Sequence, residues 1–462
     1  MFRKRDTHIH FVGIGGIGMS GIAEVLVNLG YPVTGTDLAD TETTRRLQAL
    51  GATIHRGHGA EMLGDADVVV ISSAIRADNP EVLAARQRKI PVIPRAEMLA
   101  ELMRLKQGVA IGGSHGKTTT TSLVATTLHA AGCDPTVVIG GKLNALGSNA
   151  RLGAGEVLVA EADESDGSFL MLSPIVSVIT NIDDEHMDHY GSTARLLEAF
   201  VSFAGRVPFY GLAVVCVDDP KVASILPLLH KRYVTYGFGD GADYQAYDLR
   251  HDGPSTHFKA RAHGEERGAF SILMPGVHNV LNALATIAVA DFFGVERETT
   301  RRSLAGFHGV QRRFTVRADH GGVMVVDDYG HHPTELRATL AGARASYPSR
   351  RLIGVFQPHR YTRTRDHLEE FAAAFDDADV VVLTEIYAAG EAPIAGVSLD
   401  RLYELTRARR PERPVLRAPE LGELAPMLAA MAAPGDMILT LGAGSITKVS
   451  FALAALLHAP AA

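Results

Sequence analysis

Short apolar runs alternate with amphipathic segments along most of the chain, and this pattern predicts alternating strands and helices. Residues 8–15 form an apolar run typical of a buried strand, and residues 18–30 show helical spacing of apolar positions and end at a glycine. Residues 31–37 and 66–75 predict two further buried strands. Strands separated by helical segments of this length favour a doubly wound, mostly parallel sheet.

The same alternation returns twice further along the chain. Apolar runs at 156–160 and 175–182 predict strands of a second sheet, and short alternating runs between 205 and 275 predict accessory strands before a helix at 278–293. After residue 313, strands and helices alternate regularly again. We therefore predict an α/β fold of three domains, namely a Rossmann-like domain, a P-loop-type domain with a mostly parallel sheet, and a second Rossmann-like domain: 1–106, 107–313 and 314–462.

Composition narrows the class of protein. A chain of 462 residues is too long for one core and suggests about three domains of ~150 residues each. The net charge of −7 argues against a surface that binds nucleic acid, so acidic ligands would be held at local sites. Cys133 and Cys216 have no metal-ligand spacing, which favours the reducing cytoplasm. No apolar run approaches the ~20 residues of a membrane span, so no membrane insertion is expected.

A glycine-rich segment with a lysine follows the apolar run that starts at residue 108. Gly112, Gly113 and Gly116 leave no Cβ in the way, so successive N–H groups can surround an anion at the start of the following helix. Lys117 would reach the outer phosphates, and Thr118 would offer a hydroxyl to a magnesium ion. The loop is one residue shorter than the standard Walker pattern. The alternative is a glycine-rich turn with an incidental lysine.

A second glycine pattern lies near the start of the chain. Gly13, Gly15 and Gly18 match the dinucleotide fingerprint between a predicted strand and a predicted helix. Asp37 ends the next strand, where such a site places an acid against a ribose. The fingerprint alone is weak, because the same glycines serve any ligand with a diphosphate, a UDP-sugar included.

Acids and histidines follow two strands of the predicted central sheet. One strand ends in the run Glu-Ala-Asp-Glu-Ser-Asp at 161–166, and the next ends in Asp-Asp-Glu-His-Met-Asp-His at 183–189. Carboxylates at this edge of a sheet whose first loop holds phosphates predict a magnesium site. The alternative is an acidic, solvated loop.

Two further clusters follow strands of the third predicted domain. They are Asp-Asp-Tyr-Gly-His-His-Pro at 327–333 and Pro-His-Arg-Tyr-Thr-Arg-Thr-Arg at 358–365. Basic residues at the carboxyl ends of strands indicate capture of a carboxylate or phosphate, which the planar guanidinium group fits well. The alternative is a helix amino terminus whose arginines contact neighbouring residues.

Taken in chain order, these motifs resemble the Mur ligases of peptidoglycan synthesis. The resemblance extends from His8 to the Gly-Ala-Gly-Ser segment at Gly442, and it includes His-Asn-Val-Leu-Asn-Ala at 278–283 and Arg-Arg-Phe at 312–314. The short phosphate loop is shared with folylpolyglutamate ligases and is not specific. The two clusters of the third domain together resemble those of the alanine-adding step.

The resemblance implies ATP-dependent ligation of L-alanine to the lactyl carboxylate of UDP-N-acetylmuramate through an acyl phosphate, with Mg²⁺, as two ions. It implies a UDP-sugar site at Gly15, Gly16, Ile17, Gly18, Asp37, Ser72 and Ser73. It implies an ATP site at Gly112, Gly113, Ser114, His115, Gly116, Lys117, Thr118, Thr119, Asn279, Asn282, Arg313 and Asp328. The implied metal ligands are Thr118, Glu161 and His186. The implied amino-acid site comprises Tyr329, His331, Arg360 and Arg363. The catalytic set is Lys117, Glu161, His186 and His331, with His331 as a candidate proton acceptor.

Two departures from the family pattern and two alternatives remain. Ser114 stands where the family usually has threonine, and no lysine occurs between Lys142 and Lys221, so no carbamylated lysine is predicted.

A ligase that adds a tripeptide to the same sugar is the nearest alternative. An NAD-dependent oxidoreductase would leave Lys117 and the acidic strand ends without a role. The sequence leaves the oligomeric state open between monomer and homodimer. Because the three sites fall on three predicted domains, we expect domain closure to assemble them.

Overall fold

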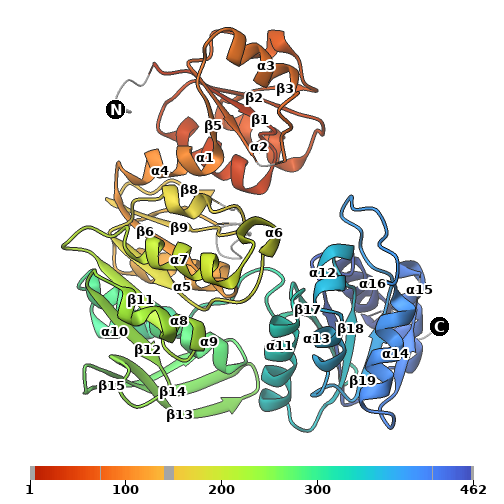
Figure 1. Cartoon of the computed structure of the whole chain (residues 1–462). Coiled ribbons are helices and arrows are strands. Elements are labelled where there is room, and N and C mark those ends of the chain that lie inside the picture. The colour runs from red at the N-terminus through yellow and green to blue at the C-terminus, as the bar shows by residue number, and fades with distance from the viewer. Residues whose placement is uncertain (1–5, 73, 140–149, 419, 459–462) are drawn as a thin grey trace. The chain divides into compact units, whose positions relative to one another are not determined.

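The computed structural model describes residues 6–72, 74–139, 150–418 and 420–458, and it contains three sheets with helices around them (Figure 1). The predicted three-domain α/β class is confirmed. The chain divides into two compact units, of which the first holds the first sheet and most of the second. The other unit holds the third sheet together with residues 248–258 and 271–280. The predicted limits at residues 106 and 313 stay predictions.

The first sheet has five parallel strands in the order β3-β2-β1-β4-β5. Val12 pairs with both Thr36 and Ile71, so three strands end at the same edge. Fully buried Ile9 and Phe11 anchor its core, each stabilising the fold by about 2 kcal/mol. The elements are β1 (Ile9–Val12), α1 (Ile17–Asn28), β2 (Val33–Asp37), α2 (Glu42–Leu50), β3 (Thr53–Arg56), β4 (Val68–Ile71), α3 (Pro80–Gln87), β5 (Val92–Pro94) and α4 (Arg95–Met103).

The central sheet has ten strands in the order β15-β14-β13-β12-β11-β10-β6-β9-β7-β8. Its middle strands are parallel, and β8 joins β7 in antiparallel orientation. The pairs Gly112 with Ile179 and Ile111 with Glu161 bring the ends of β6, β10 and β9 to one edge. The elements are β6 (Gln107–Gly112), α5 (Lys117–Ala130), β7 (Thr136–Val138), β8 (Ala150–Arg151), β9 (Val157–Glu161), β10 (Val176–Ile179), α6 (Met187–Tyr190), α7 (Thr193–Ala204), β11 (Leu212–Cys216) and α8 (Pro220–Ile225).

The predicted accessory strands are present at the far end of this sheet. The run that forms β14 buries one face and exposes the other, whereas the first run forms β11, which is buried at every position. Two helices follow them along the chain. The elements are β12 (Tyr233–Gly237), β13 (Tyr244–Asp252), β14 (Ser255–Ala262), β15 (Glu265–Ile272), α9 (Val277–Phe292) and α10 (Arg297–Ala305).

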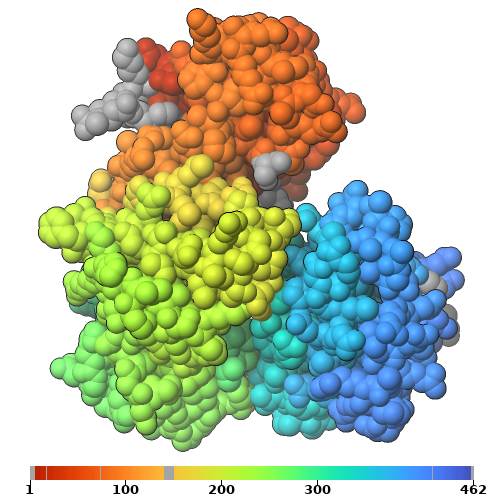
Figure 2. Space-filling view, in the orientation of Figure 1, coloured from red at the N-terminus to blue at the C-terminus, as the bar shows by residue number. Residues whose placement is uncertain are grey.

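The third sheet has six strands in the order β16-β17-β21-β18-β19-β20, and β16 is its antiparallel edge strand. Leu441 of the strand between them pairs with both Asp328 and Phe356, so the strands that carry the two predicted clusters end at the same edge of the sheet. The surface of this part of the chain is coloured blue in the space-filling view of Figure 2. The elements are β16 (Thr315–His320), β17 (Val323–Asp328), α11 (Pro333–Ser346), β18 (Arg351–Phe356), α12 (Tyr361–Asp366), α13 (Leu368–Ala373), β19 (Val380–Leu383), α14 (Leu399–Arg409), β20 (Val415–Arg417), α15 (Leu421–Met431), β21 (Asp436–Leu441) and α16 (Thr447–His458).

Among the helices of the described residues, none combines the length and the apolar character that a bilayer span requires.

Candidate active site

The predicted phosphate loop joins β6 to α5, and two of its glycines have backbone angles that favour glycine. Gly113 has a φ of +123° and Gly116 a φ of +82°. A Cβ on Gly113 would lie 2.1 Å from Thr180 Oγ1, so no larger residue fits there without a shift of β10's end. Helix α5 begins at Lys117 with no side-chain cap. The N–H groups of its first turn therefore suit an anion, and the loop fits the phosphates of a nucleotide.

Asn181, just after β10, holds the phosphate loop from one side. Its carbonyl accepts from Ser114 N at 3.0 Å, and its side-chain oxygen accepts from His115 N at 2.8 Å. Its side-chain amide donates to His115 O at 3.0 Å. Two N–H groups of the loop are thus used within the protein. The sequence signal was an amide side chain directly after a buried strand, which our sequence analysis did not single out.

Ser114, which stands where the family usually has threonine, uses its hydroxyl in a hydrogen bond within the protein. Ser114 Oγ accepts a hydrogen bond from Asp183 N at 2.8 Å. A threonine hydroxyl makes the same kind of bond, and we therefore expect this departure from the family pattern to be tolerated.

Lys117 points into its own loop. Its Nζ donates to Gly113 O at 2.5 Å and Ser114 O at 3.0 Å. The third partner is Glu164, whose two carboxylate oxygens lie 3.0 and 2.9 Å from Nζ. Burial opposes the charged form, but Glu164 more than offsets this and raises the pKa of Lys117 above its usual value. Lys117 is therefore a protonated, preorganised cation at the phosphate loop.

Glu164 is the partner that our sequence analysis missed. Its side chain is 2% exposed, and burial raises the pKa of Glu164 to about 7 against the opposing effect of Lys117. Tyr190 fixes the backbone here by donating to Glu164 O at 2.5 Å. In a run of three acids among four residues, the sequence carries no signal for which carboxylate turns inward.

The predicted metal ligands occupy neighbouring strand and helix ends. Glu161 is the last residue of β9, and Thr118 is the second residue of α5. His186, at a φ of +58°, precedes α6, and its Nε2 lies 3.6 Å from Glu185 Oε2 and 4.0 Å from Glu164 Oε1. The carboxylate of Glu161 and the hydroxyl of Thr118 suit Mg²⁺, which prefers oxygen ligands, whereas His186 offers a nitrogen donor. Their joint role as ligands stays a prediction.

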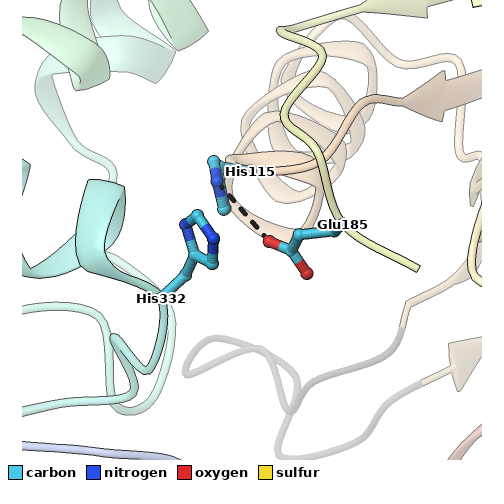
Figure 3. Close-up of side chains that lie close together, drawn as sticks. All are labelled: His115, Glu185 and His332. Atoms are coloured by element: carbon cyan, nitrogen blue, oxygen red, sulfur yellow. Dashed lines mark ion pairs between the residues drawn. The ribbon is translucent and has the colours of Figure 1, made fainter. Parts of the chain in front are cut away.

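His115 of the phosphate loop faces acids on the loop after β10. Its Nε2 lies 3.2 Å from Asp183 Oδ2 and 3.6 Å from Glu185 Oε1, and the second pair is drawn in Figure 3. The side chain thus helps to hold two acids near the loop. Its predicted contact with ATP stays a prediction, as does that of Thr119, which is buried in α5.

Both asparagines of α9 are buried, and their side chains make hydrogen bonds within the protein. Asn282 Oδ1 accepts from Thr120 Oγ1 at 3.0 Å, and a Cβ on Gly116 would lie 2.9 Å from the same oxygen. Asn282 therefore supports the start of α5. Asn279 donates its side-chain amide to Pro275 O at 2.8 Å. Whether either asparagine contacts adenine stays a prediction.

The first sheet carries the glycine fingerprint at its carboxyl edge. Gly13, at a φ of +79°, donates its N–H to Thr36 O at 2.8 Å. Gly16 precedes α1, which has no side-chain cap, so this helix also begins with open N–H groups. A Cβ on Gly18 would lie 3.0 Å from the side chain of Arg95. This geometry suits a diphosphate.

Asp37 holds the glycine loop in this structure. Its Oδ2 accepts from Gly15 N at 2.8 Å, and its Oδ1 accepts from Ala39 N at 3.1 Å. Ser72 lies directly after β4 at the same edge, whereas Ser73 and the side chain of Ile17 lie outside the described residues. The predicted contacts of these residues with the UDP-sugar stay predictions.

Arg313 and Asp328 stabilise the segment that leads into the third sheet. Asp328 accepts from Phe314 N at 2.8 Å and Gly330 N at 2.7 Å, and burial raises its pKa. Arg313 donates to Glu335 Oε1 at 3.2 Å. Burial opposes its charge, but Glu335 and Asp328 keep the pKa of Arg313 raised. Both residues have structural partners here, and their predicted contacts with the nucleotide stay predictions.

His331 and Tyr329 lie beside each other after β17. Their ring centroids are 5.1 Å apart, and His331 Nδ1 is 3.1 Å from Tyr329 O and 3.2 Å from Glu335 Oε2. The same ring lies 5.9 Å from that of His359, at the end of β18. Burial lowers the pKa of His359 to about 4, and the positive charges nearby add to this. Our sequence analysis did not single out His359, although it lies within the quoted cluster.

Arg360 is exposed, and its backbone N–H is hydrogen-bonded within the protein. Its N–H donates to Tyr387 O at 2.8 Å, and its φ is +71°, which side-chain-bearing residues rarely adopt. Among the described residues, no carboxylate lies within ion-pair distance of its guanidinium group. Arg363 lies one turn on in the short helix α12. An exposed arginine in a strained backbone conformation suits the capture of a ligand carboxylate.

Comparison with known proteins gives one consistent result along the chain. Three sequence profiles match it, described as "Mur ligase family, catalytic domain" at residues 8–107, "Mur ligase middle domain" at 111–290 and "Mur ligase, glutamate ligase domain" at 312–444. The UDP-N-acetylmuramate--L-alanine ligase of Anaeromyxobacter sp. (strain Fw109-5) is 58% identical over 459 residues, 99% of this chain and 100% of that protein.

Two further similarities agree with this one. The protein of the same name from Myxococcus xanthus (strain DK1622) is 58% identical and covers 99% of this chain and 97% of its own length. The crystal structure of the UDP-N-acetylmuramate-alanine ligase from Thermotoga maritima has a TM-score of 0.81 at 31% identity, and the match covers 96% of this chain and 98% of that one.

Proposed function

The chain belongs to the Mur ligase family, and from this premise we propose that it joins L-alanine to the lactyl carboxylate of UDP-N-acetylmuramate with ATP. The products are UDP-N-acetylmuramoyl-L-alanine, ADP and phosphate, and the reaction belongs to peptidoglycan precursor synthesis. The observation that carries this proposal is the half-buried Lys117 at a glycine loop, in a chain that is 58% identical over its length to a ligase with these named substrates.

The reaction needs an activated acid, because a carboxylate is a poor acceptor for an amine. ATP first transfers its γ-phosphoryl group to the lactyl carboxylate, which yields an acyl phosphate and ADP. Lys117 neutralises negative charge on the transferring group, a task of positioning and electrostatics. The loop's two glycines at positive φ allow the backbone to approach the phosphates closely.

The metal belongs to the same step. Thr118, Glu161 and His186 would hold Mg²⁺, as two ions. Bound Mg²⁺ would neutralise charge on the phosphate oxygens. Their placement at the start of α5, at the end of β9 and directly before α6 supports this assignment. Glu185 and Asp183, beside His115, add negative charge at the same edge.

The alanine amine then attacks the acyl carbon, and the tetrahedral intermediate collapses to the amide and inorganic phosphate. Arg360 and Arg363 hold the alanine carboxylate and so fix the direction of the amine. The amine must lose a proton, and His331 accepts it, since its Nδ1 is oriented by Tyr329 O and Glu335.

The UDP part of the sugar binds at the glycine fingerprint of the first sheet. Gly15, Gly16 and Gly18 allow the diphosphate to approach the start of α1, and Asp37, Ser72 and Ser73 contact the rest of the nucleotide. We place the reaction in the cytoplasm, because it uses ATP and because Cys133 and Cys216 are both free thiols.

A substrate panel tests this proposal. With UDP-N-acetylmuramate, ATP, Mg²⁺ and alanine together we expect ADP release and a product of the mass of the alanine adduct. Omission of the sugar or of alanine should remove the product. Parallel reactions contain glycine, serine or the tripeptide that a recycling ligase would add. Product formed with the tripeptide in preference to alanine, or ADP release that does not depend on the sugar, would overturn the assignment.

A further inference from the structure

The ammonium group of Lys117 is satisfied entirely from within the protein. Two of its contacts are carbonyl oxygens of its own loop, at 2.5 and 3.0 Å, and the third is the carboxylate of Glu164, at 2.9 and 3.0 Å. The exposed fraction of the side chain is 18% for Lys117 and 2% for Glu164. The lysine expected to reach a phosphate is therefore paired with a buried anion.

The described residues place few other charged groups beside Glu164. The groups around it are Lys117, the carboxylate of Asp163, and His186 Nε2 at 4.0 Å, while Tyr190 contacts its backbone carbonyl. Asp163 itself pairs with Arg95 at 3.6 Å. Removing one member of a buried ion pair leaves the other uncompensated, so Glu164 and Lys117 depend on each other energetically.

A phosphate and the Glu164 carboxylate compete for the same cation. Both are anions that need the Nζ hydrogens of Lys117, and two like charges at one ammonium repel each other. When a nucleotide enters, Lys117 must exchange its bond to Glu164 for bonds to the phosphate, or Glu164 must remain beside a second anion. In both cases the nucleotide binds less tightly than it would to a loop whose lysine has no ion-pair partner within the protein.

We propose that Glu164 is a positioning residue that holds Lys117 at the phosphate loop and lowers the loop's affinity for nucleotide by competing with the phosphates. This inference rests on the proposed role of Lys117 in binding ATP. The functional consequence is easier release of the product ADP, because the Glu164 carboxylate can re-form its ion pair with Lys117. The loop is also kept from binding small inorganic anions when no nucleotide is present.

The test is nucleotide affinity in the Glu164→Gln protein. Titration calorimetry with ADP, in EDTA so that metal ligation does not contribute, gives Kd directly. We expect Glu164→Gln to bind ADP about tenfold more tightly, because it removes the competing charge and keeps the shape. Inorganic triphosphate, which lacks adenosine, should show the same gain.

Two further variants separate this role from a structural one. Glu198→Gln removes one carboxylate from the exposed face of α7 and should leave Kd unchanged. Glu164→Asp keeps the charge but shortens the side chain, so we expect a smaller gain in affinity. If Glu164→Gln does not fold, the ADP affinity of Glu164→Asp tests the inference in its place. The midpoint of thermal unfolding without ligand should fall in Glu164→Gln and recover in Lys117→Met/Glu164→Gln, because the unpaired ammonium is gone.

The outcomes are distinct. A lower melting temperature with unchanged or weaker ADP binding would mean that Glu164 is only structural, and the inference would be wrong. If the wild type itself does not bind ADP, the proposed nucleotide site fails and the inference fails with it. Tighter binding in Glu164→Gln alone, with Glu198→Gln unchanged, is the result that the ion-pair geometry predicts.

Discussion

Replacing Lys117 with alanine is expected to reduce ADP formation by about 10³-fold, the upper range for loss of one preorganised group that stabilises transition-state charge. The ammonium group is held at the phosphate loop by three partners and is protonated at all neutral pH values. No other lysine lies in the loop segment from Gly112 to Thr119. The measurement is the steady-state rate of ADP release with saturating UDP-N-acetylmuramate, alanine and Mg²⁺.

Two controls accompany this variant. Lys221→Ala removes a lysine of the same compact unit whose partner is the half-exposed Asp184, at 2.8 Å, and should retain full activity. Because Lys117→Ala leaves Glu164 buried without its partner, folding is checked by thermal unfolding, and Lys117→Met/Glu164→Gln provides a version without the orphaned charge. ADP release near the wild-type rate in a folded Lys117 variant would remove the lysine from the mechanism.

Replacing Arg360 with alanine is expected to raise KM for alanine by about 10- to 100-fold, with a smaller change in kcat. A hydrogen bond to a charged group contributes about 1.5–3 kcal/mol, and the guanidinium group would make such bonds to the carboxylate of every bound alanine. The fold should not suffer, because the backbone N–H of Arg360 makes the structural bond to Tyr387 O. The measurement is alanine saturation at fixed ATP and sugar.

The same helix supplies the matched control. Arg365 is exposed and pairs with Asp366 at 2.7 Å, so Arg365→Ala removes the same group without touching the proposed alanine site. Arg360→Lys keeps the charge but loses the planar, two-pronged geometry and should have an intermediate KM. An unchanged alanine KM in Arg360→Ala would show that this cluster does not bind the amino acid.

Much of the fold could be predicted because the apolar periodicity of each element is a local property. The run at 8–15 and the spacing at 18–30 correspond to β1 and α1, and the alternation after residue 313 corresponds to the third sheet. The accessory strands between 205 and 275 were predicted as strands. Their order across the edge of the central sheet could not be predicted, since it depends on pairing between distant segments.

The loop itself could also be predicted, because its glycines and Lys117 are adjacent in the sequence. The residues that hold it could not. Asn181 is bonded to His115 across 66 positions, and Glu164 meets Lys117 across 47. Only the register of β6 with β9 and β10 brings these positions together. That register is set by packing rather than by any local motif.

Two acids illustrate a different limit. Asp37 was predicted to contact a ligand because it ends a strand beside the glycine fingerprint, and Asp328 because of the resemblance to the Mur ligases. In the structure Asp37 holds Gly15 N, and Asp328 holds Phe314 N and Gly330 N. Sequence alone cannot separate an acid that binds a ligand from one that fixes the backbone beside the ligand, since both occupy the same position of the same motif.

Activation of the lactyl carboxylate by ATP can be followed by isotope transfer. UDP-N-acetylmuramate labelled with ¹⁸O in both oxygens of that carboxylate is converted with ATP, Mg²⁺ and alanine, and the inorganic phosphate is analysed by mass spectrometry. An acyl phosphate carries one carboxylate oxygen into the phosphate, so the account predicts one ¹⁸O in each phosphate released. Phosphate without ¹⁸O, formed together with the alanine product, would contradict it.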